Sequence, residues 1–265
     1  MTKNSLNLRL NNFLREGYCV VKIFKKIDLD NFKKKILKKI SKNIKKNNIK
    51  IKELKNYHKI INDELHSEII DSSKRYIDLN RILQKKILSN KFIHHICKSY
   101  WGHSKRELNW VASLKKNQIR KNATAFRLAR PKNLVKKNRF KDVGGVHFDL
   151  FYGSSENYNH KALITVWCPI IGFSKLYTLR FAPKSHLKVH KKSNLENQKK
   201  YLSPVFKKKY VKNFNYIRPN LRIGEAIIFH PNLLHGGSKN LGSITRCSLD
   251  FRITNPKILK LNRKK

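Results

Sequence analysis

The sequence predicts a mainly β domain, an antiparallel sandwich or jelly roll, against which N-terminal helices pack. In residues 1–105 apolar side chains recur every three to four positions, the period of a helix buried on one side. From residue 106 the period falls to two, and short apolar runs alternate with turn residues. We therefore expect a helical part with a first strand at 1–105, a strand-rich core at 106–255 and a basic tail at 256–265.

The N-terminal part begins with a predicted helix around LNLRLNNFLREG, which Gly17 separates from an apolar strand, YCVVKIF. A second, lysine-coated helix is expected from Asp28 to about Lys46. Residues 51–100 continue the helical pattern, and Trp101-Gly102 ends it. The apolar stripe of the second helix comprises Phe32, Ile36, Leu37, Ile40 and Ile44.

The core follows as a series of runs that predict strands: ELNWVASL, ATAFRLAR, VGGVHFDLFYG, ALITVWCPI, YTLRFAP, EAIIFH and ITRCSLDFRI. A helical pattern is absent from the sequence between about 106 and 190, which favours the sandwich or jelly roll. Residues 188–213 are polar and rich in lysine. We interpret this segment as an insertion over one end of the barrel, either a lid or a solvated loop.

The net charge of +45 by itself argues for a polyanionic partner such as nucleic acid or an anionic membrane. The basic residues are spread along the whole chain instead of being gathered with aromatics, so we interpret the charge as compositional and expect no specific nucleic acid and no membrane. An apolar signal segment and a membrane-spanning run are not found in the sequence. Together with the scattered cysteines, which suggest neither zinc nor disulfides, this predicts a soluble protein of the reducing cytoplasm. The cysteines are Cys19, Cys97, Cys168 and Cys247.

A candidate metal site is formed by His147 and Asp149, which lie two residues apart in a predicted strand and so share a face. Such a tripeptide is weak evidence, since a strand histidine is more often a packed or surface residue. The best third ligand is His235, which follows another apolar strand. Two histidines and one carboxylate form the facial triad of non-haem iron, which leaves coordination positions open.

The strand after His235 offers a partner for a co-substrate. Its polar side chains, Arg246 and Ser248 among them, share one face, while its apolar ones share the other. A solvated polar face would explain this alternation as well. If the face instead points into the barrel, the guanidinium of Arg246 can clamp a carboxylate with two hydrogen bonds and the hydroxyl of Ser248 can add a donor.

With these motifs the chain resembles the phytanoyl-CoA dioxygenase-like oxygenases, which use iron(II) and 2-oxoglutarate. The pieces that match, in order, are VHFDLFYG, LITVWCPI followed by LRFAPKSH, GEAIIFHPNLLHGGSKN and TRCSLDFRI. The sequences of the last two pieces look most like the oxygenases of bacterial carbohydrate and aminocyclitol biosynthesis clusters. The likeness covers roughly residues 12–255.

The resemblance implies a double-stranded β-helix in which His147, Asp149 and His235 hold iron(II). It implies that Arg246 and Ser248 bind the distal carboxylate of 2-oxoglutarate, with Trp167 packed beside it. It also implies a dioxygenase that consumes molecular oxygen and hydroxylates a C–H bond of a small molecule. A sugar, nucleotide-sugar or aminocyclitol is the expected class of substrate, while phytanoyl-type acyl thioesters and small amino acids remain open. Halogenating relatives carry a small residue at the position of Asp149, so halogenation is disfavoured.

Four other residues are candidates for structural, metal-binding or substrate-binding roles. His186, in a Pro-Lys-Ser-His turn where the family often has Pro-Gly-Ser-His, is expected to be a structural hydrogen-bonding residue. His230 is a reserve ligand, separated from His235 by Pro231. Arg127 and Arg130 could reach an acidic or hydroxylated substrate or serve at the surface.

Two other functions remain open. Arg246 and Arg252 form the R-x5-R spacing seen in AlkB-like nucleic-acid demethylases, although the chain shows no obvious element for gripping a strand. Alternatively, the chain is a catalytically inactive jelly-roll binding protein. Retention of all three ligands together with R-x-S argues against this last possibility.

Overall fold

In the computed structural model, eleven stretches of the chain are described. They leave out, among others, the end of the predicted run VGGVHFDLFYG and most of the basic tail, so those predictions lie outside the described residues. The described residues are 2–44, 49, 51–70, 75–103, 105–111, 119–121, 123–134, 144–149, 163–196, 205–236 and 238–257.

The N-terminal segment has the predicted order of helix, strand and helix. Helix α1 (Lys3–Glu16) ends at Gly17, whose positive φ of 82° lets the chain turn directly into strand β1 (Tyr18–Lys22). Helix α2 (Lys26–Asn43) follows. As predicted, its stripe is buried, with Phe32, Ile36 and Ile40 fully inaccessible to solvent.

The described residues between 51 and 102 are mostly helical, but one strand interrupts them. The helices are α3 (Tyr57–Ile60), α4 (Asp63–Ile69), α5 (Arg81–Leu88) and α6 (Lys91–Trp101), and Gly102 caps α6 in the left-handed conformation. The prediction of continuous helix was wrong at β2 (Tyr76–Asp78). This segment pairs with residues 123–125, a partner that local periodicity does not reveal.

Among the described residues, eight strands form a larger antiparallel sheet with β12 near its centre. Strand β12 pairs with β7 along one edge and with β5 and then β3 along the other. The strands not yet bounded are β3 (Glu107–Val111), β4 (Ile119–Lys121), β5 (Ala123–Ala129), β7 (Leu163–Ile171), β10 (Glu225–Phe229) and β12 (Arg246–Thr254).

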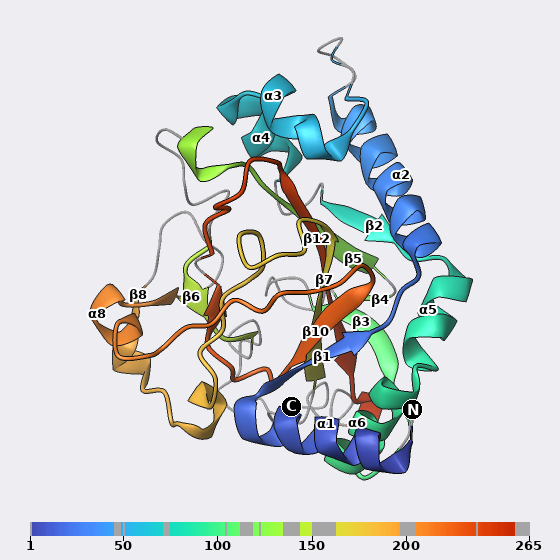
Figure 1. Cartoon of the computed structure of the whole chain (residues 1–265), viewed down its shortest axis with the longest axis vertical. Coiled ribbons are helices and arrows are strands. Elements are labelled where there is room, and N and C mark those ends of the chain that lie inside the picture. Colours follow the sequence, from blue (N-terminus) through green and yellow to red (C-terminus); the bar gives the residue numbers. More distant parts are fainter. Residues whose placement is uncertain are drawn as a thin grey trace.

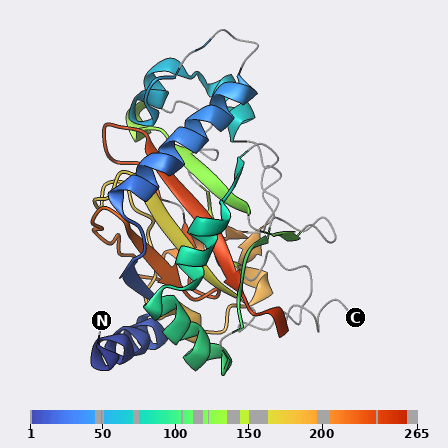
Figure 2. The same ribbon diagram turned by 90° about the vertical axis from the view of Figure 1, so that its right-hand side faces the viewer.

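The two faces of this sheet have different partners. Cys247, Leu249 and Phe251 of β12 point to the face that packs with the stripes of α2, α5 and α6 in the main hydrophobic core. Figure 1 shows α2 and α5 along one side of the sheet, and Figure 2 shows them crossing in front of the strands. The predicted packing of N-terminal helices on an antiparallel sheet is therefore confirmed. The alternate residues of β12 point to the opposite, inner face.

Opposite the inner face lies a small sheet of β6 (Val146–His147) and β11 (His235–Gly236). The run YTLRFAP was predicted as a strand, and this was wrong. Phe181 alone makes isolated bridges, to Ile217 and His235, because the residues before it form a turn. It nevertheless extends the small sheet beside His235.

The lysine-rich segment 188–213 contributes a hairpin of β8 (Leu195–Glu196) and β9 (Val205–Phe206), followed by α8 (Lys208–Val211). Phe206 packs with Phe148 and Leu234, so the segment contacts the small sheet and is not merely solvated. In Figure 1 it lies on the side away from α2. Within the part of the chain described, helices with the length and apolar character needed to cross a bilayer are not found.

Candidate metal centre

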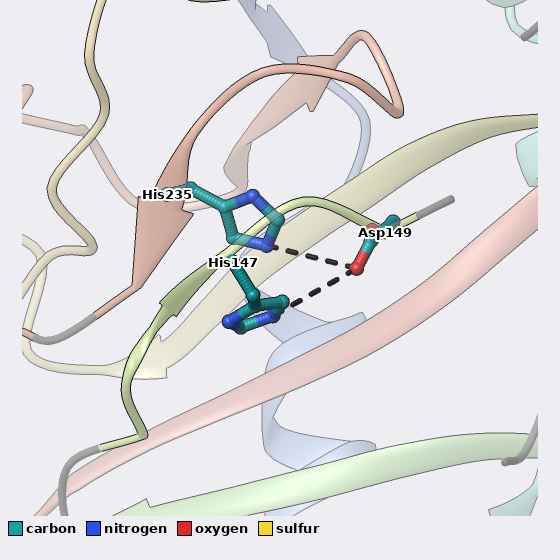
Figure 3. A group of neighbouring side chains, drawn as sticks. All are labelled: His147, Asp149 and His235. Atoms are coloured by element: carbon teal, nitrogen blue, oxygen red, sulfur yellow. Dashed lines mark ion pairs between the residues drawn. The ribbon is translucent and has the colours of Figure 1, made fainter. Parts of the chain in front are cut away.

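The small sheet brings three potential metal ligands together. His147 at the end of β6 lies directly opposite His235 at the start of β11. Oδ1 of Asp149 lies 3.9 Å from Nε2 of His147 and 3.6 Å from Nε2 of His235. One ligand atom from each residue lies within 4.8 Å of the others, and the side chains point toward one another (Figure 3).

Asp149 reaches this cluster by a different route from the one predicted. The strand ends at His147, so the two residues do not share a strand face. Instead, the amide of Asp149 donates to the carbonyl oxygen of Pro231 at 2.8 Å. The turn between β10 and β11 therefore holds the backbone of Asp149, and its carboxylate still points to the imidazoles.

Backbone contacts orient both imidazoles for metal binding. Nδ1 of His147 lies 2.9 Å from the carbonyl oxygen of Gly145, and Nδ1 of His235 lies 2.9 Å from that of Leu233. Since a carbonyl oxygen only accepts hydrogen bonds, Nδ1 carries the hydrogen in each ring, and Nε2 presents its lone pair to the cluster. This is the tautomer that a metal ion requires from both rings.

The surroundings keep these ligands in the protonation states that suit a cation. Burial, with repulsion from His235, lowers the pKa of His147 to about 3, and burial also lowers the pKa of His235. Burial by itself would raise the pKa of Asp149, but the Arg252 guanidinium and the two imidazoles outweigh it and lower that pKa. At neutral pH the cluster therefore consists of two neutral imidazoles and one carboxylate.

A glycine permits the close approach of β11 to β6 at this point. Gly236 has a φ of 98°, and a Cβ added to it would lie 2.7 Å from the carbonyl oxygen of Gly145 and 3.2 Å from the ring of His147. Both the dihedral angle and the space exclude a larger side chain. The two imidazoles and one carboxylate, held close together by the approach of β11 to β6, fit iron(II). This ion accepts such a set of ligands on one face of its coordination sphere.

Two further residues hold the Asp149 carboxylate. The hydroxyl of Thr165 on β7 donates to Oδ2, and the guanidinium of Arg252 on β12 donates to Oδ1 at 2.7 Å. Sequence reasoning missed Thr165, and it considered Arg252 only for the R-x5-R spacing. The alternation of side chains along β12 could have indicated Arg252 as a site residue, since it lies on the same face as Arg246 and Ser248.

The residues expected to bind a co-substrate all lie on the inner face of the larger sheet. Arg246 is buried and donates to the carbonyl oxygens of Tyr177 and Ser238. The hydroxyl of Ser248 and the indole N–H of Trp167 are buried, and neither has a hydrogen-bond partner among the described residues. Trp167 pairs with Asp250, which places it diagonally across from Ser248.

These two orphaned groups fit a ligand that is rich in acceptors. A buried donor without a partner costs about 1–3 kcal/mol, and a carboxylate oxygen would relieve that cost. With the guanidinium of Arg246 on the same strand, the inner face offers a charged donor and two neutral donors. This set matches 2-oxoglutarate, which presents carboxylate and keto oxygens.

The other sequence candidates lie apart from the cluster. Nε2 of His230 contacts the hydroxyl of Tyr100 at 2.8 Å, and Nε2 of His186 contacts the carbonyl oxygen of Leu14 at 3.0 Å. His230 thus connects α6 with the turn before β11, and His186 connects α1 with the short turn of residues 185–187. Arg130 is buried in an ion pair with Asp63. Arg127 points to the inner face and pairs with Asp250.

Comparison with known families gives one match over nearly the whole chain. The model described as phytanoyl-CoA dioxygenase (PhyH) matches residues 13–248, a span that includes all three cluster residues and Arg246. A search of curated proteins found no match.

Solved structures with a similar fold come from enzymes of low sequence identity. SnoK, a non-haem α-ketoglutarate-dependent carbocyclase from nogalamycin biosynthesis, shares 13% identity at a TM-score of 0.54, covering 96% of this chain and 84% of SnoK. SnoN, an epimerase from the same biosynthesis, shares 12% at 0.55, covering 96% and 82%. EctD from S. alaskensis, solved with 2-oxoglutarate and 5-hydroxyectoine, shares 12% at 0.55, covering 97% and 77%.

Proposed function

Because the chain belongs to the phytanoyl-CoA dioxygenase family and is an iron(II)- and 2-oxoglutarate-dependent enzyme, we propose that it hydroxylates a C–H bond of a small polar metabolite such as a sugar or carbohydrate precursor. The observation that carries the proposal is the His147–Asp149–His235 cluster, in which both Nε2 lone pairs and a carboxylate oxygen converge. A small polar molecule, 5-hydroxyectoine, is bound by the similarly folded EctD, which supports this class of substrate.

In this proposal the three residues hold iron(II), which, when bound, supplies the activation of dioxygen. The backbone carbonyls of Gly145 and Leu233 keep each imidazole in the required tautomer. Thr165 and Arg252 fix the carboxylate of Asp149, so that one oxygen faces the imidazoles while the other is held away. The chain thereby presents a prearranged set of ligands on one face of the metal.

We assign the co-substrate to the inner face of β12. Arg246 would pair with the distal carboxylate of 2-oxoglutarate, and Ser248 and Trp167 would donate the hydrogens that have no partner within the described residues. Burial of all three side chains excludes water from these bonds, which strengthens the charge-assisted bond from the guanidinium.

The same family membership supports two further proposals. We propose that the sheets form the double-stranded β-helix, with 106–255 as the oxygenase core and 1–105 as its helical cover. We also propose a reducing cytoplasmic setting, which the four buried thiol side chains support.

A spectroscopic titration tests the metal and co-substrate roles together. Anaerobic addition of iron(II) and 2-oxoglutarate should produce a metal-to-ligand charge-transfer band, which His147→Ala and Asp149→Ala should weaken. Arg81→Ala, at an exposed position of α5, is the control. The proposal fails if the intact protein gives no band and forms no succinate under air.

The substrate class is tested by the coupling of succinate formation to substrate. We expect sugars, sugar acids or nucleotide-sugars to accelerate succinate release and to gain a hydroxyl group, detected as one added oxygen atom by mass spectrometry. If acyl thioesters or free amino acids are hydroxylated while every carbohydrate is inert, the carbohydrate assignment is wrong.

A further inference from the structure

A line of ion pairs runs from the metal cluster along the inner face of the larger sheet. Arg252 donates to Asp149 and to Asp250, each at 2.7 Å. Asp250 also accepts from the Nε and a terminal nitrogen of Arg127, at 3.0 and 2.8 Å. Asp250 and Arg252 therefore link Arg127 to Asp149 of the metal cluster.

This line leads from the protein interior toward solvent. The side chains of Arg252 and Asp250 are 5% and 8% exposed, whereas that of Arg127 is 35% exposed. Arg127 lies directly opposite Ser248 in the pairing of β5 with β12, so both point to the inner face.

The charges around the cluster favour an anion. Among the described charged groups on the inner face of β12 and those whose charges act on Asp149 and Asp250, the guanidiniums outnumber the carboxylates. The guanidiniums are Arg75, Arg127, Arg246 and Arg252, and the carboxylates are Asp149 and Asp250. Iron(II) and 2-oxoglutarate carry equal and opposite charges, so binding both leaves this positive excess in place.

We propose that Arg127, held by Asp250, receives an acidic group of the substrate, so that the molecule oxidised here carries a carboxylate or a phosphate. The inference rests on the proposed function and narrows it from a polar metabolite to an anionic one, such as a sugar acid or a sugar phosphate. The planar guanidinium suits both oxyanions, because it offers parallel N–H donors at the spacing of two oxygens. Asp250 keeps the guanidinium oriented, and the side chain of Arg127 as a whole remains 35% exposed.

Arg127 is favoured over the other arginines near the cluster. Arg130 is buried against Asp63, and Arg252 is held between two buried carboxylates. Arg180 and Arg218 donate to backbone carbonyls around the β11 segment, at Gly236 and Thr178. Arg127 combines partial exposure with a position on the inner face.

The test compares molecules that share one scaffold. Glucose, glucuronate and glucose 6-phosphate are titrated anaerobically, at millimolar concentration, into the protein loaded with iron(II) and 2-oxoglutarate, and the shift of the charge-transfer band is followed. We expect at least one anion to bind more tightly than glucose, and the comparison of the two anions identifies carboxylate or phosphate. Arg127→Gln should raise the dissociation constant of that anion about ten- to a hundredfold, which is the usual contribution of a hydrogen bond to a charged group.

Three controls separate a specific contact with Arg127 from general attraction to the basic surface. Arg127→Lys should restore part of the anion binding, and Arg81→Gln, which removes an exposed charge elsewhere, should leave it unchanged. The affinity for 2-oxoglutarate should be unaffected by Arg127→Gln. Equal loss in Arg81→Gln would instead indicate nonspecific attraction to the basic surface and would overturn the proposal.

Two negative results are distinguishable. If the band forms with 2-oxoglutarate but glucose binds as well as both anions, or neither anion shifts the band, the anionic-substrate inference is wrong and the proposed oxygenase function stands. If no band forms at all, both fall together.

Discussion

Replacement of Arg252 by methionine should destabilise the metal-free protein strongly. The side chain of Arg252 is 5% exposed and donates to two carboxylates, Asp149 and Asp250, whose side chains are 1% and 8% exposed. Methionine fills much of the same volume but leaves both carboxylates without this counter-ion. Thr165 still donates to Asp149, and Arg127 still donates to Asp250, so the charges are not wholly uncompensated.

The expected magnitude follows from the burial of the pair. Removing one partner of a buried ion pair costs about 3–5 kcal/mol. For a chain of this size each kcal/mol lowers Tm by roughly 2–4 °C, so Arg252→Met should lower Tm by about 6–20 °C. Arg252→Lys keeps the positive charge, but its ammonium group cannot bond both carboxylates as the planar guanidinium does. Its Tm should therefore lie between those of the wild-type protein and Arg252→Met.

The dependence on pH separates an electrostatic cause from lost packing. Burial alone would raise the pKa values of Asp149 and Asp250, but Arg252, together with the imidazoles at Asp149 and Arg127 at Asp250, outweighs it and both are lowered. Such carboxylates add stability above their unfolded pKa of about 4, and lose it as pH falls through the folded pKa. In the variant they take up protons more readily, so the difference in Tm should be largest near pH 7 and should narrow toward pH 4.

The measurement is thermal unfolding of both proteins in the presence of a chelator, at several pH values. Arg81→Met, at an exposed position, serves as the control for a change of net charge. The reasoning would be refuted if Arg252→Met lowered Tm no more than Arg81→Met does, or if the difference from wild type stayed constant with pH.

Other predictions address the ligands and their frame. His235→Ala should abolish the charge-transfer band and also lower Tm of the metal-free protein, because the buried ring packs against Phe229 and its loss leaves a cavity; an unchanged band would remove His235 from the metal site. Ser248→Ala should raise the dissociation constant for 2-oxoglutarate about tenfold, as expected for one hydrogen bond to a charged group, and an unaltered titration would contradict that role. Gly236→Ala should weaken iron binding and lower Tm, because its Cβ would lie 2.7 Å from the carbonyl oxygen of Gly145; tight binding of iron by this variant would show that β11 can move away from β6. Thr165→Val should lower iron affinity severalfold, with Thr178→Val, whose hydroxyl bonds Pro219 instead, as the control; equal effects would point to general destabilisation.

Local periodicity in the sequence was sufficient for much of the fold. The stripe of α2 and the strand character of β7, β10 and β12 follow from the spacing of apolar residues, which depends only on neighbours within one element. Gly17 marked the end of α1 for an equally local reason, the need for a positive φ. The same reasoning failed at β2 and at Phe181, where pairing with distant strands decides the conformation.

For the site, the sequence by itself determined the ligand types and the alternation on β12 that puts Arg246, Ser248 and Arg252 on one face. Only the tertiary structure decided that His235 lies opposite His147, that Pro231 holds the backbone of Asp149, and that Arg252 bridges two carboxylates. The physical reason is that these contacts join residues far apart in the chain. Whether these contacts form depends on which strands become neighbours in the folded protein. The pattern of residues next to one another in the sequence does not determine this pairing.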